Sequence, residues 1–238
     1  MEANPPPTKN ASGRHFKLLT TENHYRKAHS MTPETTAIIL VDDDNDFLSE
    51  GGKLNNAVKP VIERYGVIDN INSLMRSARK HGVLVIHVPI VFSPDYREMG
   101  DSPYGIFKVV KEAGAFQRGT WGAKVADVLD AHDSDIVVDG KSSTCAFATT
   151  NLKEILDEFG IRTVALGGLL TNICIESTMR TAYDMGYDVY TLTDCSATVS
   201  DDAQQAAIGF DWPLFSKPVT HDVFVKTLVE SAPAQASA

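Results

Sequence analysis

The stretch TVALGGLLTNICIESTMRTAYDMG, residues 163–186, decides the fold class of this 238-residue chain. It opens with a short apolar run typical of a strand buried on both faces, and it continues with helical spacing that ends near Gly186. Strand-like runs recur at AIILVD (37–42), VLVIHV (83–88), DIVVDG (135–140) and DVYTLTD (188–194), and further helical segments span 67–82 and 149–160. This alternation predicts an α/β fold of the Rossmann-like kind, a three-layer α/β/α sandwich with a mainly parallel, roughly six-stranded sheet. Ligands of such folds bind at the carboxyl ends of the strands.

Composition limits the classes of partner. With 22 basic and 31 acidic side chains, the formal charge is -9, which disfavours binding to nucleic acid or to an anionic membrane. No apolar stretch approaches the ~20 residues of a membrane helix, and the first residues do not have the pattern of a signal peptide. Three cysteines without a C-x-x-C pair favour a reducing compartment over a disulfide framework. We therefore expect a cytoplasmic protein that acts on a small molecule.

The length favours one domain, which we place at residues 31–230. Residues 1–30 are rich in Pro, Asn and His and are expected to form an N-terminal arm, whereas residues 231–238 are expected to be a disordered tail. The stretch from Pro89 to Gly119 is too long for an ordinary connection and is expected to form a pocket wall.

The first strand ends in the acidic run DDDNDF, residues 42–47. Its D-x-D-x-D spacing matches the start of a calcium loop, but Phe47 stands where that loop requires Gly and Lys53 where it requires Glu. The calcium interpretation therefore fails. A strand followed by D-x-D also resembles the nucleophile motif of haloacid-dehalogenase-type phosphatases, with Asp42 as phosphoryl acceptor. Asp46 stands where that family has Thr or Val, so this interpretation is kept only as an alternative.

Cys174 follows the strand at 163–168 in the first turn of a predicted helix. Unpaired N–H groups and the helix dipole favour a thiolate at such a position, and we expect a lowered pKa. Gly167 and Gly168 allow a sharp turn, and Thr171 or Asn172 can cap the helix.

The third strand is followed directly by Lys141, which in isolation would be an ordinary solvated turn residue. Cys145 and Cys195 are interpreted as small buried hydrophobic residues. The combination is more specific than any single residue, because Asp42, Lys141 and Cys174 each follow a different strand of one parallel sheet.

Three stretches together resemble the isochorismatase-like cysteine hydrolases, and the resemblance extends from about residue 37 to about residue 228. They are IILVDDDNDF (38–47), KSSTCAFATTNLKEIL (141–156) and GGLLTNICIESTMRTAYDMGYDV (167–189). The family has an apolar residue and then Gln after its catalytic Asp, and Asp43 and Asp44 replace them here. This departure puts a different charge beside the expected site.

The resemblance implies that Cys174 is the nucleophile, Asp42 the general base and Lys141 the third member of the triad. It also implies a cis peptide between Leu169 and Leu170, and an oxyanion hole formed by the backbone N–H groups of Leu170 and Cys174.

Substrate class follows from comparison within that family. Its zinc-dependent nicotinamidases carry histidines after the first strand, and none occurs here between Met31 and Lys80, so we expect no metal and no cofactor. His87 is interpreted as a core or pocket histidine.

True isochorismatases cleave a vinyl ether without needing a cysteine, so Cys174 favours C–N hydrolysis. RGTWG (118–122) and NICIESTMR (172–180) look like the ureidoacrylate amidohydrolases, which makes a linear ureido or carbamoyl amide the first hypothesis. The residues expected to wall the pocket are aromatic: Phe47, Tyr104, Trp121 and Phe147.

Two other functions stay open: an isochorismatase that releases pyruvate, and a catalytically silent binding protein. The family often forms dimers or tetramers, so a homo-oligomer is expected, with the arm suited to an interface.

Overall fold

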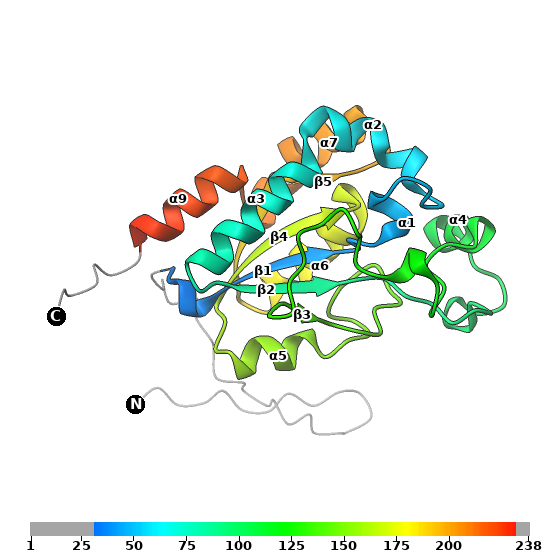
Figure 1. The fold of residues 1–238 in the computed structure, drawn as a ribbon, viewed down its shortest axis with the longest axis horizontal. Helices are drawn as coiled ribbons and strands as arrows, with labels where there is room; N and C mark the ends of the chain where they lie inside the picture. Colours follow the sequence, from blue (N-terminus) through cyan, green and yellow to red (C-terminus); the bar gives the residue numbers. More distant parts are fainter. Residues whose placement is uncertain (1–30, 232–238) are drawn as a thin grey trace, which may run out of the picture.

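The computed structural model describes residues 31–231. The predicted N-terminal arm lies outside the described residues, and so does the predicted C-terminal tail apart from Ser231. The described chain forms a six-stranded sheet in the order β3-β2-β1-β4-β5-β6, and every neighbouring pair is parallel (Figure 1). The strands are β1 (Thr36–Val41), β2 (Leu84–Val88), β3 (Ile136–Val137), β4 (Thr163–Leu169), β5 (Asp188–Ala197) and β6 (Lys217–Val219).

The predicted strands occur in the structure with changed lengths. β3 keeps only two residues of the six-residue run, and β5 continues three residues beyond its predicted end. β6 does not stand out in the sequence, because it has three residues and one of them is Pro218. It pairs with β5 alone at the edge of the sheet, where a proline can be accommodated.

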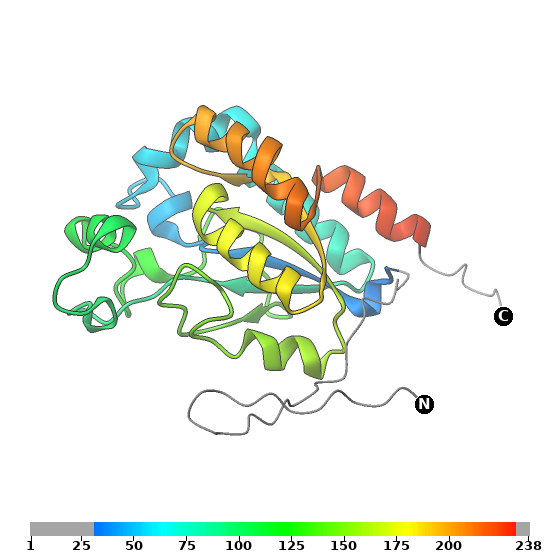
Figure 2. The same ribbon diagram turned by 180° about the vertical axis from the view of Figure 1, so that it is seen from behind.

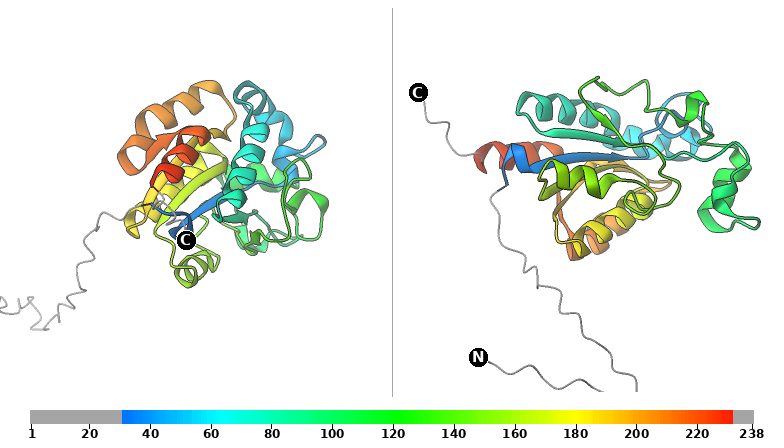
Figure 3. Two further views of the ribbon diagram at one scale, coloured as in Figure 1. Left: turned by 60° about the vertical axis from the view of Figure 1, so that its left-hand side comes forward. Right: turned by 90° about the horizontal axis from the view of Figure 1, so that it is seen from below.

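Helices cover both faces of the sheet, as predicted for a three-layer sandwich (Figures 2 and 3). One face packs against α2 (Asn55–Tyr65), α3 (Val67–Lys80) and α9 (His221–Ser231). The other packs against α5 (Leu152–Glu158), α6 (Glu176–Asp184) and α8 (Trp212–Phe215). Alternate residues of β1 divide between the two cores: Ile38 and Leu40 belong to the first, and Ile39 and Val41 to the second.

Three further helices are α1 (Asn45–Leu48), α4 (Gly105–Ala113) and α7 (Asp201–Ala206). The long stretch 89–119 contains α4, which the sequence analysis did not identify and which lies beyond the carboxyl ends of the strands (Figure 1). Within residues 31–231, no helix has the length and apolarity needed to cross a membrane.

The strand order indicates where ligands bind in a sheet of this kind. From β1 the chain first proceeds outward to β2 and β3 and later returns to β4 on the other side, so the order reverses between β1 and β4. Crevices form at the carboxyl ends of strands at such a point. Gly168 lets β4 approach β1 closely, since its φ is +113° and a Cβ there would lie 2.0 Å from the carbonyl oxygen of Val41.

Candidate active site

Asp42 lies directly after β1 at this reversal point. Its φ is +54°, an uncommon value for a residue other than glycine, and its N–H donates to the Val88 carbonyl at 3.1 Å. Its side chain is only 1% exposed. The backbone therefore turns sharply at the strand end and holds a carboxyl group away from solvent.

Lys141 follows β3, which lies on the other side of β2 from β1, and its side chain reaches Asp42. Its carbonyl accepts a hydrogen bond from the Val91 N–H at 2.8 Å, which fixes the backbone after β3. Its Nζ lies 2.6 Å from Asp42 Oδ1, and its side chain is fully buried. The structure thus brings together two predicted site residues that are separated by almost one hundred positions.

Cys174 completes the cluster from β4. It lies in a single π-helical turn, Thr171–Ile175, between β4 and α6, and it is buried. Its thiol lies next to the Asp42 carboxyl group and the Leu170 N–H, and both act on its protonation. The peptide bond between Leu169 and Leu170 is cis. Asp42 therefore contacts both the lysine and the cysteine.

The electrostatics of the thiol differ from the expectation based on its position at a helix start. Burial and the charge of Asp42 raise the pKa of Cys174, and the opposing effects of Lys141 and the Leu170 N–H are smaller. The resting cysteine is consequently a neutral thiol, and sulfur becomes nucleophilic only when a base removes its proton.

The other two members have matching shifts. Burial raises the pKa of Asp42, although Lys141 and Cys174 oppose this rise. Burial disfavours the ammonium form of Lys141, but the negative charge of Asp42 opposes this effect, and the pKa of the lysine is raised. Asp42 is thus a stronger base than an exposed aspartate and stands beside a permanent cation.

The predicted helix caps are not formed. Leu170 is the residue before the π-helical turn, and no side chain caps it. Thr171 Oγ1 instead donates to Gln204 Oε1 at 2.6 Å, and Asn172 Oδ1 accepts from Thr198 Oγ1 at 2.7 Å. These two side chains tie the turn to segments that follow β5, which local sequence does not reveal.

Asn45 and Asp46 have structural roles that residue-level reasoning missed. Asn45 Nδ2 donates to the Trp121 carbonyl at 3.1 Å, and Asp46 Oδ2 accepts from the Phe116 N–H at 2.7 Å. Gly122 packs on the same carboxyl group, because a Cβ there would lie 2.3 Å from Asp46 Cγ. The two polar residues thus anchor the 116–122 loop beside the site.

Asp43 and Asp44, the departures from the family pattern, are both fully buried. Asp43 Oδ2 lies 2.5 Å from His87 Nδ1, whereas Asp44 Oδ2 accepts a hydrogen bond from the Ile90 N–H at 3.2 Å. Burial, together with the charges of Asp42 and Asp43, holds the pKa of Asp44 well above its ordinary range. Asp44 is therefore favoured in its neutral form.

Two of the four aromatic residues expected to wall the pocket are core residues. Phe47 is buried and packs on Phe116 with ring centroids 4.9 Å apart. Phe147 is buried in the core beneath α5 and α6, where it stacks on Tyr187 at 6.2 Å. Their contacts are accounted for by packing.

The other two aromatic residues are exposed. Trp121 is 42% exposed, and its Nε1 donates to Asp127 Oδ2 at 2.7 Å. Tyr104 is 87% exposed and lies at the surface directly before α4. The Trp121 carbonyl accepts a hydrogen bond from Asn45 Nδ2, which ties its backbone to the segment after Asp42.

A cluster of possible metal ligands lies away from this site in the described chain. Ligand atoms of Asp194, Cys195 and His221 fall within 4.8 Å of one another. Asp194 already accepts from the His221 N–H at 2.8 Å and lies 2.7 Å from its Nδ1, at the start of α9. These contacts make the cluster a helix cap. Cys145 and Cys195 are buried and unpaired with each other, as expected from sequence.

Comparisons with known proteins agree with this architecture. Residues 36–223 match the isochorismatase domain. The chain is 30% identical over 219 residues to the ureidoacrylate amidohydrolase RutB of Rhizobium rhizogenes, which covers 87% of this chain and 89% of the relative. It is 33% identical over 191 residues to the protein of the same name from Klebsiella pneumoniae, covering 75% and 80% of the two chains. A cysteine hydrolase from Pseudomonas syringae pv. phaseolicola has the same fold, with a TM-score of 0.74 at 22% identity over 86% of this chain and 97% of that one.

Proposed function

This chain belongs to the isochorismatase family of hydrolases, and from that premise we propose that it is a metal-independent cysteine amidohydrolase. The proposed substrate is a small amide, ureido or carbamoyl compound whose C–N bond is cleaved through an acyl-enzyme on Cys174. The amidohydrolase relatives at about the 30% identity level support the reaction class. The observation that carries the proposal is the buried contact of Asp42 with both Lys141 and Cys174.

The first half of the reaction uses that contact. Asp42, as a carboxylate, takes the thiol proton while sulfur attacks the carbonyl carbon, because a neutral buried thiol needs a base in contact with it. The tetrahedral intermediate then collapses, and Asp42 returns the proton to the leaving nitrogen. Ammonia or an amine departs, and a thioester remains on Cys174.

Backbone N–H groups supply the proposed oxyanion hole. The influence of the Leu170 N–H on the Cys174 thiol supports the assignment of this group as one of the donors. With the Cys174 N–H it would bind the developing oxyanion, a role worth roughly 10²–10³ in rate per donor in other hydrolases.

The second half of the reaction hydrolyses the thioester. Asp42 accepts a proton from water, the hydroxyl oxygen attacks the thioester carbonyl, and the thiolate leaves and is reprotonated by Asp42. Lys141 stays charged throughout and keeps the carboxylate from retaining the proton. The net reaction consumes one water and yields an acid and an amine.

The family name gives a reason to keep one other function, vinyl-ether hydrolysis with pyruvate release. That reaction needs an acid such as Asp42 but gives sulfur no role. The deciding experiment assays ureido acids, carbamoyl compounds, primary amides and isochorismate in parallel for ammonia and pyruvate.

We expect ammonia from the C–N substrates, diversion to a hydroxamate when hydroxylamine is present, and loss of both with Cys174→Ala. Pyruvate from isochorismate with full activity in Cys174→Ala would establish the other reaction. No turnover, together with an unreactive Cys174 thiol, would indicate a binding protein.

A further inference from the structure

A continuous row of four charged side chains runs from Asp43, the residue next to Asp42, toward the residue that precedes β3. Asp43 Oδ2 lies 2.5 Å from His87 Nδ1, and His87 Nε2 lies 3.4 Å from Asp135 Oδ2. Asp135 is in turn held by Arg79, whose Nε and terminal nitrogen lie 3.0 Å and 2.5 Å from its two oxygens. The four residues come from the end of β1, from β2, from the residue before β3 and from α3.

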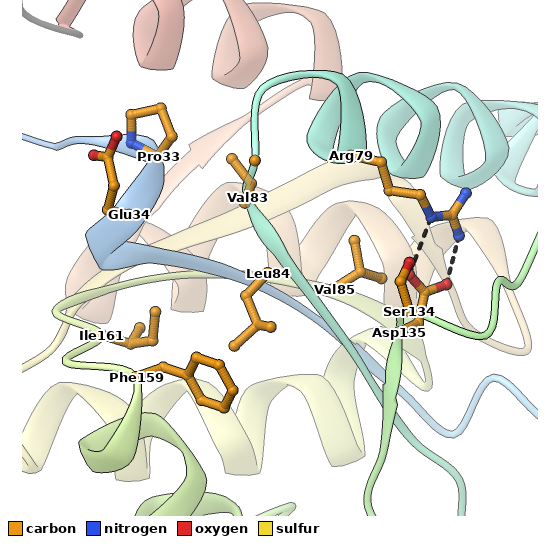
Figure 4. A pocket seen from close by; sticks show the side chains of 11 residues that line it. Pro33, Glu34, Arg79, Val83, Leu84, Val85, Ser134, Asp135, Phe159 and Ile161 are labelled. Atoms are coloured by element: carbon orange, nitrogen blue, oxygen red, sulfur yellow. Dashed lines mark hydrogen bonds and ion pairs between the residues drawn. The ribbon is translucent and has the colours of Figure 1, made fainter.

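Burial of these four side chains increases toward Asp42. Arg79 is 21% exposed and Asp135 is 2% exposed, whereas His87 and Asp43 are completely buried. Figure 4 shows the Arg79–Asp135 pair at the wall of a surface pocket of about 320 Å³. His87 alternates with Ile86 and Val88, which face α5 and α6, so its ring lies on the α3 side of the sheet.

The geometry favours a positively charged histidine. Each ring nitrogen faces a carboxylate oxygen, and a neutral imidazole has one N–H, so it could donate to only one of them. Asp43 Oδ1 has no hydrogen-bond partner among the described residues, which leaves His87 as the group that compensates this buried carboxylate. Burial opposes a charge on His87, but Asp43 and Asp135 outweigh it and raise the pKa of the ring. Arg79 balances the charge of Asp135, so the charges of these four residues sum to zero.

We propose that doubly protonated His87 is a positioning residue, the buried counter-ion of Asp43, and that through Asp43 it keeps the neighbouring Asp42 ionised as a base. The chain of cause is electrostatic. The charge of Asp43 raises the pKa of Asp42, and a cation on the far side of Asp43 offsets that effect. The kinetic part rests on the proposed hydrolysis, whereas the protonation state of His87 does not.

The first test is an NMR titration of the full chain with ¹⁵N-labelled histidine, assigned with His87→Gln. The His87 ring should lose its second proton at a pH above the ordinary value of about 6.5, and Asp43→Asn should lower that midpoint. A wild-type midpoint at or below about 6.5, or one that Asp43→Asn does not change, would overturn the proposal. This test needs no substrate, so it stands even if the amidohydrolase proposal fails.

The second test is the pH dependence of kcat/KM. His87→Gln should move the acidic limb to higher pH, with about a tenfold loss below the limb for each pH unit of displacement. Adding Asp43→Asn should move the limb back, because the carboxylate that needed a counter-ion is gone. His132→Gln, at an exposed histidine, is the matched control and should leave the limb unchanged. A uniform loss in His87→Gln with an unmoved limb, or no recovery in the double variant, would show that His87 only packs.

Discussion

Replacing Lys141 by Met removes the charge that faces Asp42 while keeping most of the side-chain volume. The wild-type ion pair is 2.6 Å long, and its side chains are 0% and 1% exposed, so solvent cannot take over the role of the ammonium group. Breaking a buried pair by removing one partner typically costs about 3–5 kcal/mol. We therefore expect Lys141→Met to be both inactive and strongly destabilised at neutral pH.

The loss should depend on pH, because the variant can escape the penalty by protonating Asp42. Burial raises the pKa of Asp42 above the 3.8 of an ordinary aspartate already in the wild type, and without the opposing charge of Lys141 we expect this pKa to rise further. A raised folded pKa lowers stability as pH rises from the unfolded value to the folded one, by at most about 1.4 kcal/mol per pH unit. This contribution is limited to roughly 1.6 kcal/mol at pH 5 and grows to about 4 kcal/mol at pH 7.

Urea unfolding of the wild type, Lys141→Met and the double variant Lys141→Met/Asp42→Asn at pH 5, 6 and 7 measures this directly. The single variant should lose progressively more stability as pH rises. The double variant has no carboxylate to strand, so it should be more stable than the single variant at pH 7 with little pH dependence of its deficit. A single-variant deficit that is equal at pH 5 and pH 7, or a double variant that is no better at pH 7, would refute the buried-pair reasoning.

Three other outcomes are expected. Asp44→Asn should gain stability relative to the wild type as pH rises above about 4, because the folded pKa of Asp44 is raised and the wild type loses stability over that range. Urea unfolding from pH 4 to 8 measures the difference between the two proteins, which would be constant if the pKa of Asp44 were that of an exposed aspartate. Iodoacetamide should modify Cys174 before Cys145 or Cys195, with parallel loss of hydrolysis and slower labelling in Asp42→Asn; peptide mapping that finds another cysteine modified first would move the nucleophile. Exhaustive treatment with EDTA should leave turnover unchanged, and a loss reversed by zinc would assign a metal to the reaction.

Much of the site was readable from sequence because strand ends are local features. Buried parallel strands appear as apolar runs, and the residue after each run lies at the same edge of the sheet. Asp42, Lys141 and Cys174 could therefore be predicted to lie near one another, and the structure places them in contact. The short edge strand β6, with its Pro218, has no such run and was missed.

By itself the sequence determined the order of five of the six strands, the parallel sheet and the three residue types at its carboxyl edge. Only the tertiary structure decided their protonation, because a pKa depends on burial and on charges from distant parts of the chain. The neutral thiol of Cys174 follows from its burial beside Asp42, whereas its position at a helix start had predicted a lowered pKa. His87 gains its partners Asp43 and Asp135 from 44 and 48 residues away, a pairing that no local pattern encodes.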